Sequence, residues 1–439
     1  MSLIRSVVKL ARGWPLLVSL TLASGAALAQ VAGCPMTPVG AKPIVNTGLP
    51  VVEVWTNANA PILDRDNYVK GCLRITNGSR QSYSTGLYNG AIEIRGRGNS
   101  TWDMPKKGYR VKLAAPGAQV LDMPSDRDWV LLANYADKTL MRGDVGFELG
   151  RRLGMAWTPR MRHVDVYLNG EFLGNYQLGE HVKVAPNRVN VSAMAATDVA
   201  EPNLGGGYLV EADFAAYTSP SDVLTFTGSG LLFNIKAPGT INQTQIKYIG
   251  NYLQNVEHAL IYNHFSPTAS NAYPAMIDVD SFIDWWIVKE LVKDIDGPFY
   301  SSVYLYKDRG RKLKMGPLWD FDLSSGNAYY EDISDPRGWR IRTKSEWFAH
   351  LFQDPVFRLR AYNRWKAVRA SQIDTLLTFI DQTAVALDAS QRENFKRWTI
   401  LNQYVWPNAQ VAGSYAGEVT FLKDFLRTRI RWIDRNLTP

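Results

Sequence analysis

Residues 294–322 read DIDGPFYSSVYLYKDRGRKLKMGPLWDFD. The segment 302–307 is rich in β-branched and aromatic residues, as strands usually are. The segment 312–318 is a second such run, and the Arg-Gly-Arg sequence at 309–311 suits a tight turn between two antiparallel strands. The pattern therefore predicts a β-hairpin with aspartates just beyond both of its outer ends.

The geometry of this hairpin would bring those aspartates together. A turn centred on its glycine places Ser302 roughly opposite Leu318, so Asp296 and Asp320 leave the two strands at the same end. Clustered carboxylates repel one another unless a cation or a proton relieves them. The residues alone leave two interpretations open: a metal-dependent site with one free carboxylate, or a hairpin whose loop acids are merely solvated.

Three further segments make the first interpretation more specific. They are residues 94–113 (IRGRGNSTWDMPKKGYRVKL), 129–142 (WVLLANYADKTLMR) and 166–180 (VYLNGEFLGNYQLGE). In order and type, these segments and the hairpin are similar to the CotH family of kinase-like proteins, which is named for a spore coat protein. The resemblance runs from about Leu49 to about Asn436, and the combination of motifs makes it specific.

The resemblance implies an α+β chain with a two-lobed, atypical protein-kinase-like fold. The β-rich N-terminal lobe would span about 49–183, and the mixed to α-rich C-terminal lobe about 184–436. The periodicity of the chain agrees with this order, because short alternating runs give way to long helical ones. A hairpin is predicted across Asn169-Gly170. Helices are predicted over 139–153, 244–263 and 281–292, the last with Asp280 as its N-cap.

Family resemblance also assigns roles to the aspartates. Asp296 matches a catalytic-loop aspartate, which would orient and deprotonate an acceptor hydroxyl. Asp320 matches the metal-binding aspartate of a Trp-Asp-x-Asp motif, and Asp322 would be a second ligand of Mg²⁺ or Mn²⁺. One departure from the pattern is that protein kinases carry an asparagine shortly after the catalytic aspartate. In this chain Ser301 and Ser302 occupy that region, and hydroxyls are weaker metal ligands.

Nucleotide contacts are expected around the glycine loop at 96–101. Glycines let backbone N–H groups approach an anion, and nearby cations neutralise it. The residues expected to bind ATP are Arg97, Asn99, Ser100, Lys107, Lys112, Glu148 and Glu180. Strand alternation would put Lys107 on the face opposite Lys106 and Lys112, so which lysine contacts phosphate stays open.

The two glutamates in this set have different expected roles. Glu148 would orient the phosphate-contacting lysine through an ion pair, or it would only pair with Arg151 or Arg152 on its own helix. Glu180 ends the motif of residues 166–180, where a nucleotide would be held between the lobes.

The first 29 residues have the composition of an export signal. Cationic residues come first, an apolar run follows over 14–28, and Ala27-Leu-Ala29 suits cleavage. Residues 30–48 would then form an N-terminal arm of an exported protein in the periplasm, at the cell surface or outside the cell. The box Val31-Ala-Gly-Cys34 leaves a lipoprotein as an alternative. The only other cysteine is Cys72, and two cysteines in an exported protein fit one disulfide.

Composition excludes several other classes. The net charge is +8, part of it in the leader, and no long basic run predicts nucleic-acid binding. Beyond the leader, no segment has the roughly 18 apolar residues of a membrane span. The five histidines are scattered without zinc-ligand spacing, and no Gly-x-Ser-x-Gly nucleophile elbow occurs.

The leading hypothesis is an exported kinase-like enzyme that uses ATP and a divalent metal to phosphorylate hydroxyl groups of a protein substrate. The alternative is a catalytically weak or inactive module for assembly or binding at the envelope or cell surface. The absent asparagine and the scarcity of ATP outside the cytoplasm favour the module, whereas the three retained aspartates favour the enzyme. Transfer of another group, such as AMP or glutamate, is a third reading, because fold does not determine reaction.

Overall fold

The computed structural model describes residues 43–114, 118–214, 218–262 and 272–439. The predicted signal peptide, the first part of the predicted arm and Cys34 lie outside these ranges. Within them, Cys72 is disulfide-bonded. No described helix has the length and apolarity that crossing a membrane would require.

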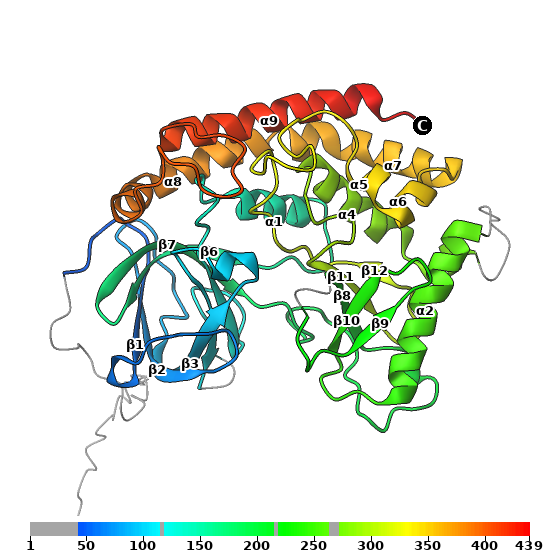
Figure 1. Ribbon diagram of the computed structural model, residues 1–439, viewed down its shortest axis with the longest axis horizontal. Helices are drawn as coiled ribbons and strands as arrows, with labels where there is room; N and C mark the ends of the chain where they lie inside the picture. Colours follow the sequence, from blue (N-terminus) through cyan, green and yellow to red (C-terminus); the bar gives the residue numbers. More distant parts are fainter. Residues whose placement is uncertain (1–42, 115–117, 215–217, 263–271) are drawn as a thin grey trace, which may run out of the picture.

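Seven strands in the first part of the chain close into a barrel (Figure 1). They are β1 (Val51–Thr56), β2 (Val69–Thr76), β3 (Asn89–Arg97), β4 (Gly108–Leu113), β5 (Asp128–Leu132), β6 (Met161–Leu168) and β7 (Glu171–Glu180). Around the barrel the order is β1-β2-β3-β4-β5-β7-β6, and only the closing pair of β1 and β6 is parallel. Alternate side chains such as Val52, Ile94 and Val111 fill its interior, as a period of two requires.

The predicted turn at Asn169-Gly170 joins β6 to β7. Both residues have positive φ angles, 51° and 81°, which is the conformation that a two-residue hairpin turn needs. Asn169 and glycine are the residue types that adopt it at low cost, so this hairpin is confirmed.

A second, five-stranded sheet follows the barrel in the order β12-β11-β8-β10-β9. Its strands are β8 (Tyr208–Ala212), β9 (Leu224–Phe226), β10 (Leu232–Ala237), β11 (Val303–Lys307) and β12 (Lys314–Met315). Leu305 lies opposite Met315, which is the register predicted for the acidic hairpin. Strand β12 is shorter than the predicted run 312–318, because Pro317 has no N–H to donate to a ladder.

The two faces of this sheet differ in polarity. On one face Val210 lies beside Leu305 and Ile235, and these apolar residues belong to the main core. On the other face Glu211 lies beside Tyr304 and Asn234. A sheet with one apolar and one polar face buries the first against helices and leaves the second to line a cavity or face water.

The described residues also form α-helices, most of them in the second half of the chain. They are α1 (Arg142–Arg152), α2 (Gln243–Tyr262), α3 (Tyr273–Met276), α4 (Val279–Leu291), α5 (Ile341–Lys344), α6 (Glu346–Leu351), α7 (Pro355–Val368), α8 (Leu376–Arg397) and α9 (Tyr415–Asn436). The three predicted helices correspond to α1, α2 and α4. The predicted N-cap of α4 was wrong, because Asp278 rather than Asp280 accepts the Ser281 N–H, at 3.1 Å.

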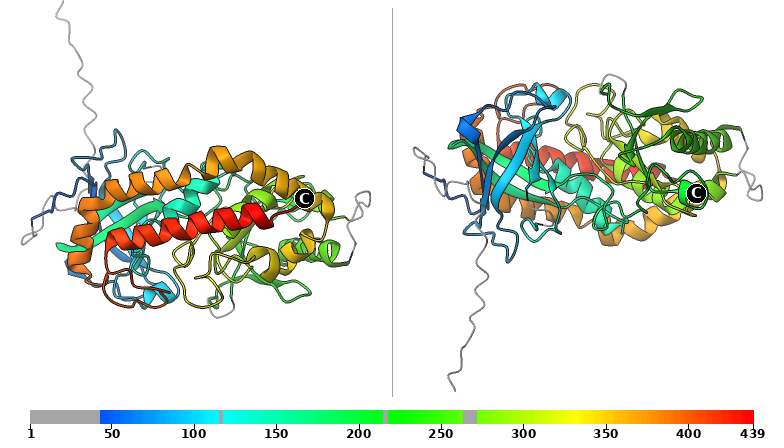
Figure 2. Two further views of the ribbon diagram at one scale, coloured as in Figure 1. Left: turned by 90° about the horizontal axis from the view of Figure 1, so that it is seen from above. Right: turned by 90° about the horizontal axis from the view of Figure 1, so that it is seen from below.

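Helix α4 lies at the centre of the helical part. Its residues Phe282, Trp285, Trp286 and Leu291 are almost completely buried, and it contacts α1, α7, α9 and β12. Helix α8 packs on β7 of the barrel and on α9, which in turn packs on α4. Figures 1 and 2 show α8 and α9 running along the top of the molecule, over both the barrel and the helical part. The chain is therefore an α+β protein with a β-rich N-terminal part and a helical C-terminal part, as predicted.

A buried ion pair joins α4 to α9. The Arg429 guanidinium donates to the Glu290 carboxylate at 2.6 Å, and both side chains are almost inaccessible. The same carboxylate accepts the backbone N–H groups of Arg340 and Arg342, at 2.7 and 2.9 Å. This carboxylate therefore joins α4, α9 and the start of α5.

Replacing Arg429 by Met should lower the free energy of unfolding by about 3–5 kcal/mol, because it leaves the Glu290 carboxylate buried without its partner. The matched control is Arg427→Met on the same helix, since Arg427 pairs with Asp424 at the exposed surface. That variant should stay within about 0.5 kcal/mol of the wild type. Urea denaturation followed by circular dichroism measures both, and equal effects would contradict the structural role of the pair.

Candidate functional site

The three aspartates singled out in the sequence line one cleft between the barrel and the five-stranded sheet. The cleft has a volume of about 1100 Å³, and Asp296, Asp320 and Asp322 all border it. Asp320 is exposed into it, whereas the other two are half-buried. The predicted gathering of acids at one end of the hairpin is therefore present.

A buried lysine near the end of α4 holds both acidic segments in place. The Lys289 ammonium donates to the Asp294 carboxylate at 2.5 Å and to the Trp319 carbonyl at 2.6 Å. It also reaches the Asp320 carbonyl at 3.4 Å. Asp294 lies just before Asp296, so one cation links the two chain segments that carry the candidate site residues.

Helix α1 supports the same segment from the barrel side. Gly146 has no side chain where Phe321 packs, and a Cβ there would lie 2.4 Å from the Phe321 ring. The buried Arg142 side chain pairs with Asp137 at 2.6 Å and donates to the Ser324 carbonyl at 3.2 Å. Close helix packing and this arginine thus position the loop on both sides of Asp322.

Asp320 and Asp322 form the part of the site that suits a cation. Their carboxyl groups hydrogen-bond to each other, and the Ser302 hydroxyl donates to Asp320 at 3.3 Å. Burial raises the pKa of Asp322 well above its usual range, and the nearby charge of Asp320 raises it further. A divalent cation bound between the two groups would remove this repulsion and bring Asp322 to full charge.

The donor set fits a magnesium ion that is shared with a ligand rather than fully enclosed by protein. Within the described ranges, no group of three or more His, Cys, Asp or Glu side chains is arranged to hold a metal. Mg²⁺ is commonly bound by one or two carboxylates, with waters and substrate phosphates completing its shell. Asp320 and Asp322 could supply those two carboxylates, and the Ser302 hydroxyl lies beside Asp320 at 3.3 Å.

Asp296 is in a different electrostatic environment. Burial raises its pKa well above the usual range, followed by the charges of Asp294 and Asp320, while Lys289 and Arg340 oppose the rise. A carboxylate of raised pKa is a stronger proton acceptor than an ordinary one. Asp322 has a raised pKa for the same leading reason, so what distinguishes Asp296 is the presence of two cations, Lys289 and Arg340, that oppose the rise.

The barrel wall of the cleft is cationic. The basic residues on it are Arg95, Arg97, Arg110, His181 and Lys183. The Arg97 guanidinium lies over the Trp319 ring at 5.3 Å, next to Asp320, and burial lowers its pKa while Asp320 opposes the shift. Burial, followed by Arg110 and Arg97, lowers the pKa of His181 well below its usual range, so this imidazole is neutral at pH 7.

The structure brings some of the predicted nucleotide-binding residues into the cleft and leaves others outside it. Arg97, Asn99 and Ser100 line it. Lys107 instead donates to the Trp102 carbonyl, and the Lys112 ammonium lies over the Tyr68 ring at 4.4 Å. Those two lysines have local partners on the barrel.

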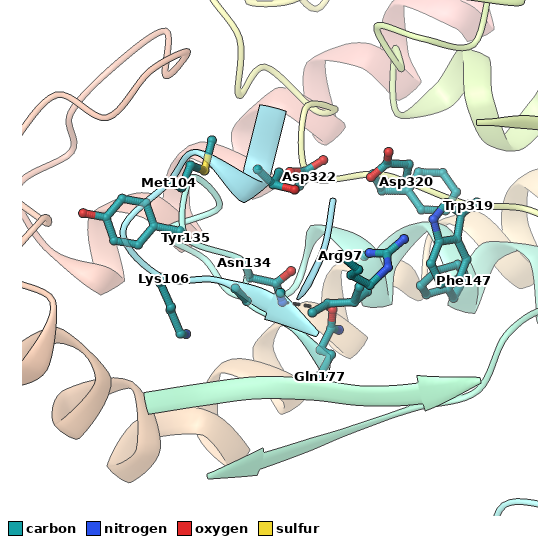
Figure 3. Close-up of a pocket in the computed structure, with 16 residues that line it drawn as sticks. Arg97, Met104, Lys106, Asn134, Tyr135, Phe147, Gln177, Trp319, Asp320 and Asp322 are labelled. Carbon is teal, nitrogen blue, oxygen red and sulfur yellow. Dashed lines mark hydrogen bonds between the residues drawn. The ribbon is translucent and has the colours of Figure 1, made fainter. Parts of the chain in front are cut away.

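Lys106 borders a smaller cavity of about 60 Å³ beside the cleft. Its ammonium donates to the Asn175 carbonyl and to Asn394 on α8, the latter at 2.9 Å. Figure 3 shows its side chain pointing away from Asp320 and Asp322. The same view shows the hydrogen bond between Asn134 and Gln177 at the floor of this cavity, 2.9 Å long.

Neither predicted glutamate lines the cleft. Glu148 pairs with Arg151 at 2.9 Å and with Arg152 at 2.8 Å on the surface of α1, which is one of the two alternatives left open by the sequence. Glu180 is buried and pairs with Arg160 at 2.9 Å. Both carboxylates are therefore occupied by arginines outside the site.

Sequence reasoning missed the sheet wall of the cleft. The polar residues on it are Glu211, Asp213, Asn234, Lys236 and Tyr304. The sequence did indicate a strand face that is polar, since polar residues alternate with apolar ones in 208–213 and 232–237. Alternation alone does not show whether such a face borders a cleft or bulk solvent. The Ser301 hydroxyl donates to Asp213 at 2.8 Å, so of the two adjacent serines only Ser302 contacts Asp320.

A comparison with protein families matches this chain to a known family over most of its length. The family described as CotH kinase protein matches residues 94–433, which run from β3 to α9 and include every cleft residue named above. No curated protein matches the chain.

Replacing Lys289 by Met should lower the melting temperature strongly, because the Asp294 carboxylate would be left buried and unpaired. The double variant Lys289→Met/Asp294→Asn removes both charges and should recover part of the loss. The control is Lys247→Met at an exposed position of α2, which should leave the melting temperature unchanged. Thermal unfolding measures all three, and a double variant no more stable than the single one would contradict the charge-pairing role.

Proposed function

The chain belongs to the CotH family, and from this premise and the geometry of the cleft we propose that it is a kinase-like phosphotransferase. It would transfer the terminal phosphoryl group of ATP to a hydroxyl group of a protein substrate. The observation that carries the proposal is the cleft itself, which sets two hydrogen-bonded carboxyls, a separate basic carboxylate and a cationic wall around one space. Phosphoryl transfer needs these groups and little else, because catalysis there is mostly positioning and charge stabilisation.

The residues divide the proposed work between the two walls. Arg97, beside Asp320, would neutralise the phosphate oxygens, and the glycine loop would add backbone N–H groups. Asp320 and Asp322 would hold Mg²⁺ or Mn²⁺, which supplies positive charge to the phosphates when bound. The β-rich barrel and the helical part would correspond to the two lobes of a kinase-like fold.

Asp296 would orient the acceptor hydroxyl and accept its proton. Burial, Asp294 and Asp320 raise the pKa of Asp296. This favours the role, because a carboxylate with a higher pKa binds a proton more tightly. Lys289 would act indirectly, by positioning the backbone on which Asp294 and Asp320 sit.

A second candidate is a binding or assembly module that keeps the fold without catalysis. The observation in its favour is the serine pair in place of an asparagine, since the only hydroxyl contact to Asp320 is the 3.3 Å bond from Ser302 among the described residues. A hydroxyl is a weaker metal ligand than an amide oxygen, so metal and nucleotide would be held less tightly.

We also propose that the protein works outside the cytoplasm. The leader composition supports export, and the disulfide at Cys72 supports an oxidising compartment, because disulfides are rare in reducing ones. The same disulfide argues against a lipid on Cys34, because Cys34 is the only other cysteine and one sulfur cannot carry both a lipid and a disulfide, so we propose release by cleavage after Ala29.

Replacing Asp320 by Asn and Asp296 by Asn should impair the protein differently. Asp320→Asn removes charge from the metal site, so both the affinity for ATP with Mg²⁺ and the turnover should fall. Asp296→Asn should lower turnover by about 10²–10⁴-fold, the usual contribution of a positioned base, while nucleotide affinity stays near that of the wild type. Calorimetry with Mg²⁺ or a chelator measures binding, and intact-mass analysis after incubation with ATP and a protein acceptor identifies the transferred group.

The control for this pair is Asp424→Asn on the exposed face of α9, and melting temperatures must match before activities are compared. Two folded and fully active site variants would exclude the catalytic assignment. ATP binding that is unaffected by chelation would exclude the shared metal, and a gain equal to AMP would replace phosphoryl transfer by AMP transfer. A wild-type chain that binds no nucleotide would favour the module.

A further inference from the structure

One border of the cleft carries exposed aromatic side chains from two loops. The first loop follows Asp322 and the second precedes α9. The aromatic residues, called the aromatic rim below, are Tyr329, Tyr330, Tyr404 and Trp406. Of these, Tyr330 and Trp406 line the cleft, and Tyr329, Tyr404 and Trp406 are 56%, 57% and 45% exposed.

The rings of the rim form one continuous surface. Tyr330 stacks on Trp406 with ring centroids 6.4 Å apart and planes 16° apart. Tyr329 meets Tyr330 edge-on at 5.4 Å, and Tyr404 lies on the same loop as Trp406, two residues before it. A contiguous exposed patch of Tyr and Trp is unusual on a free surface and typical of the centres of binding interfaces.

Hydrogen bonds fix the rim to the acidic loop. The Asn327 amide donates to the Asp322 carbonyl at 2.6 Å and accepts from the Asn408 amide at 3.0 Å. The Tyr329 N–H donates to the Pro407 carbonyl at 3.1 Å. The loop that carries Trp406 is therefore held to the segment that carries Asp322, and a ligand would not have to order it on binding.

The rim also packs against the chain segment that carries Asp296. Tyr330 packs against the cluster that contains Ile295, the residue immediately before Asp296. The Arg340 guanidinium donates to the Ile295 carbonyl at 2.7 Å, and it pairs with Glu331 beside the rim at 2.9 Å. A molecule lying on the rim would therefore lie in the same cleft as Asp296.

An exposed cation stands next to the aromatic surface. Lys344 lines the same cleft and is exposed, and within the described part of the chain no ion pair involves it. The charge of Lys344 helps to lower the pKa of Glu331, but Arg340 holds that carboxylate in the close pair at 2.9 Å, so the Lys344 ammonium stays accessible to a ligand on this side. Its charge complements an acidic group.

The cationic barrel wall and the aromatic rim suit different ligands. Anionic phosphates match Arg97 and its neighbours beside Asp320, whereas the rim offers broad apolar faces and the exposed charge of Lys344. Tyr and Trp side chains, which have apolar faces and a polar edge, are among the residues that contribute most to protein–protein binding.

We propose that the aromatic rim and Lys344 form the docking surface for the acceptor protein. The surface would take an extended segment that has an apolar or aromatic side chain and an acidic side chain beside its hydroxyl residue. The proposal rests on the proposed phosphotransfer for the role of that hydroxyl, and on the rim alone for binding.

The test uses fluorescein-labelled nine-residue peptides with a central serine and the full-length protein, with fluorescence anisotropy as the readout and no ATP present. One peptide carries Leu, Phe and two Asp around the serine, a second has Lys in place of Asp, and a third has Gly in place of Leu and Phe. The wild-type protein should bind the first at least tenfold more tightly than the others.

Variants then separate the two parts of the surface. Trp406→Ala should weaken binding of the first peptide at least tenfold, a typical loss for a central aromatic residue, and Trp406→Phe should retain most of it. Lys344→Glu should reverse the preference for Asp over Lys. Tyr262→Ala, at the exposed end of α2 and away from the cleft, should change nothing. Equal melting temperatures are required of all variants.

Several results would overturn the docking proposal. One is peptide affinity that Trp406→Ala leaves unchanged in a folded protein. Another is a loss of ATP affinity without a loss of peptide affinity, which would assign the rim to the nucleotide. Binding of an N-acetylglucosamine hexamer instead of the peptides, abolished by Trp406→Ala, would make the rim a carbohydrate surface.

The same experiments keep this proposal separate from the proposed function. Peptide binding that depends on Trp406 and Lys344 in a protein without nucleotide binding would support the docking surface and exclude the phosphotransferase. Phosphoryl transfer to a protein acceptor that is insensitive to Trp406→Ala and Lys344→Glu would support the enzyme and exclude the docking surface.

Discussion

The arrangement of the cleft depends on one buried ammonium group. Lys289 donates to the Asp294 carboxylate and to the carbonyls of Trp319 and Asp320, so it links the two ends of the acidic hairpin. A buried cation is costly unless such partners surround it. The apolar face of α4 places the lysine there, because that helix is enclosed by the core on nearly every side.

The two walls of the cleft come from different parts of the chain, and helices fix their relative position. Cations lie on the barrel, whereas the polar face of the five-stranded sheet and the acidic loops form the opposite wall. Helix α8 packs on β7, and α9 packs on α8 and α4. The distance between Arg97 and Asp320 is thus set by helices that contribute no side chain to the cleft.

Much of the fold could be predicted from local pattern. Side chains alternate between the two faces of a strand, and glycine or asparagine marks a tight turn. The turn and register of the acidic hairpin and the Asn169-Gly170 turn could therefore be predicted from the order of the residues. The predicted N-cap of α4 was wrong because Asp278 and Asp280 are both locally suitable caps. The predicted length of β12 was wrong because Pro317 ends the hydrogen-bonded ladder. For the site, the gathering of Asp296, Asp320 and Asp322 was predictable, and so was the glycine loop beside them.

By itself, the sequence determined which residues share a strand face and which acids leave the hairpin together, because both depend only on backbone geometry over a few residues. Tertiary structure alone decided that Lys107 and Lys112 stay on the barrel, that Glu148 and Glu180 pair with arginines, and that the sheet wall and the aromatic rim border the acids. The physical reason is that alternation defines a face but not the element that covers it. Packing between distant segments decides whether a charged side chain is paired, exposed or turned into a cleft.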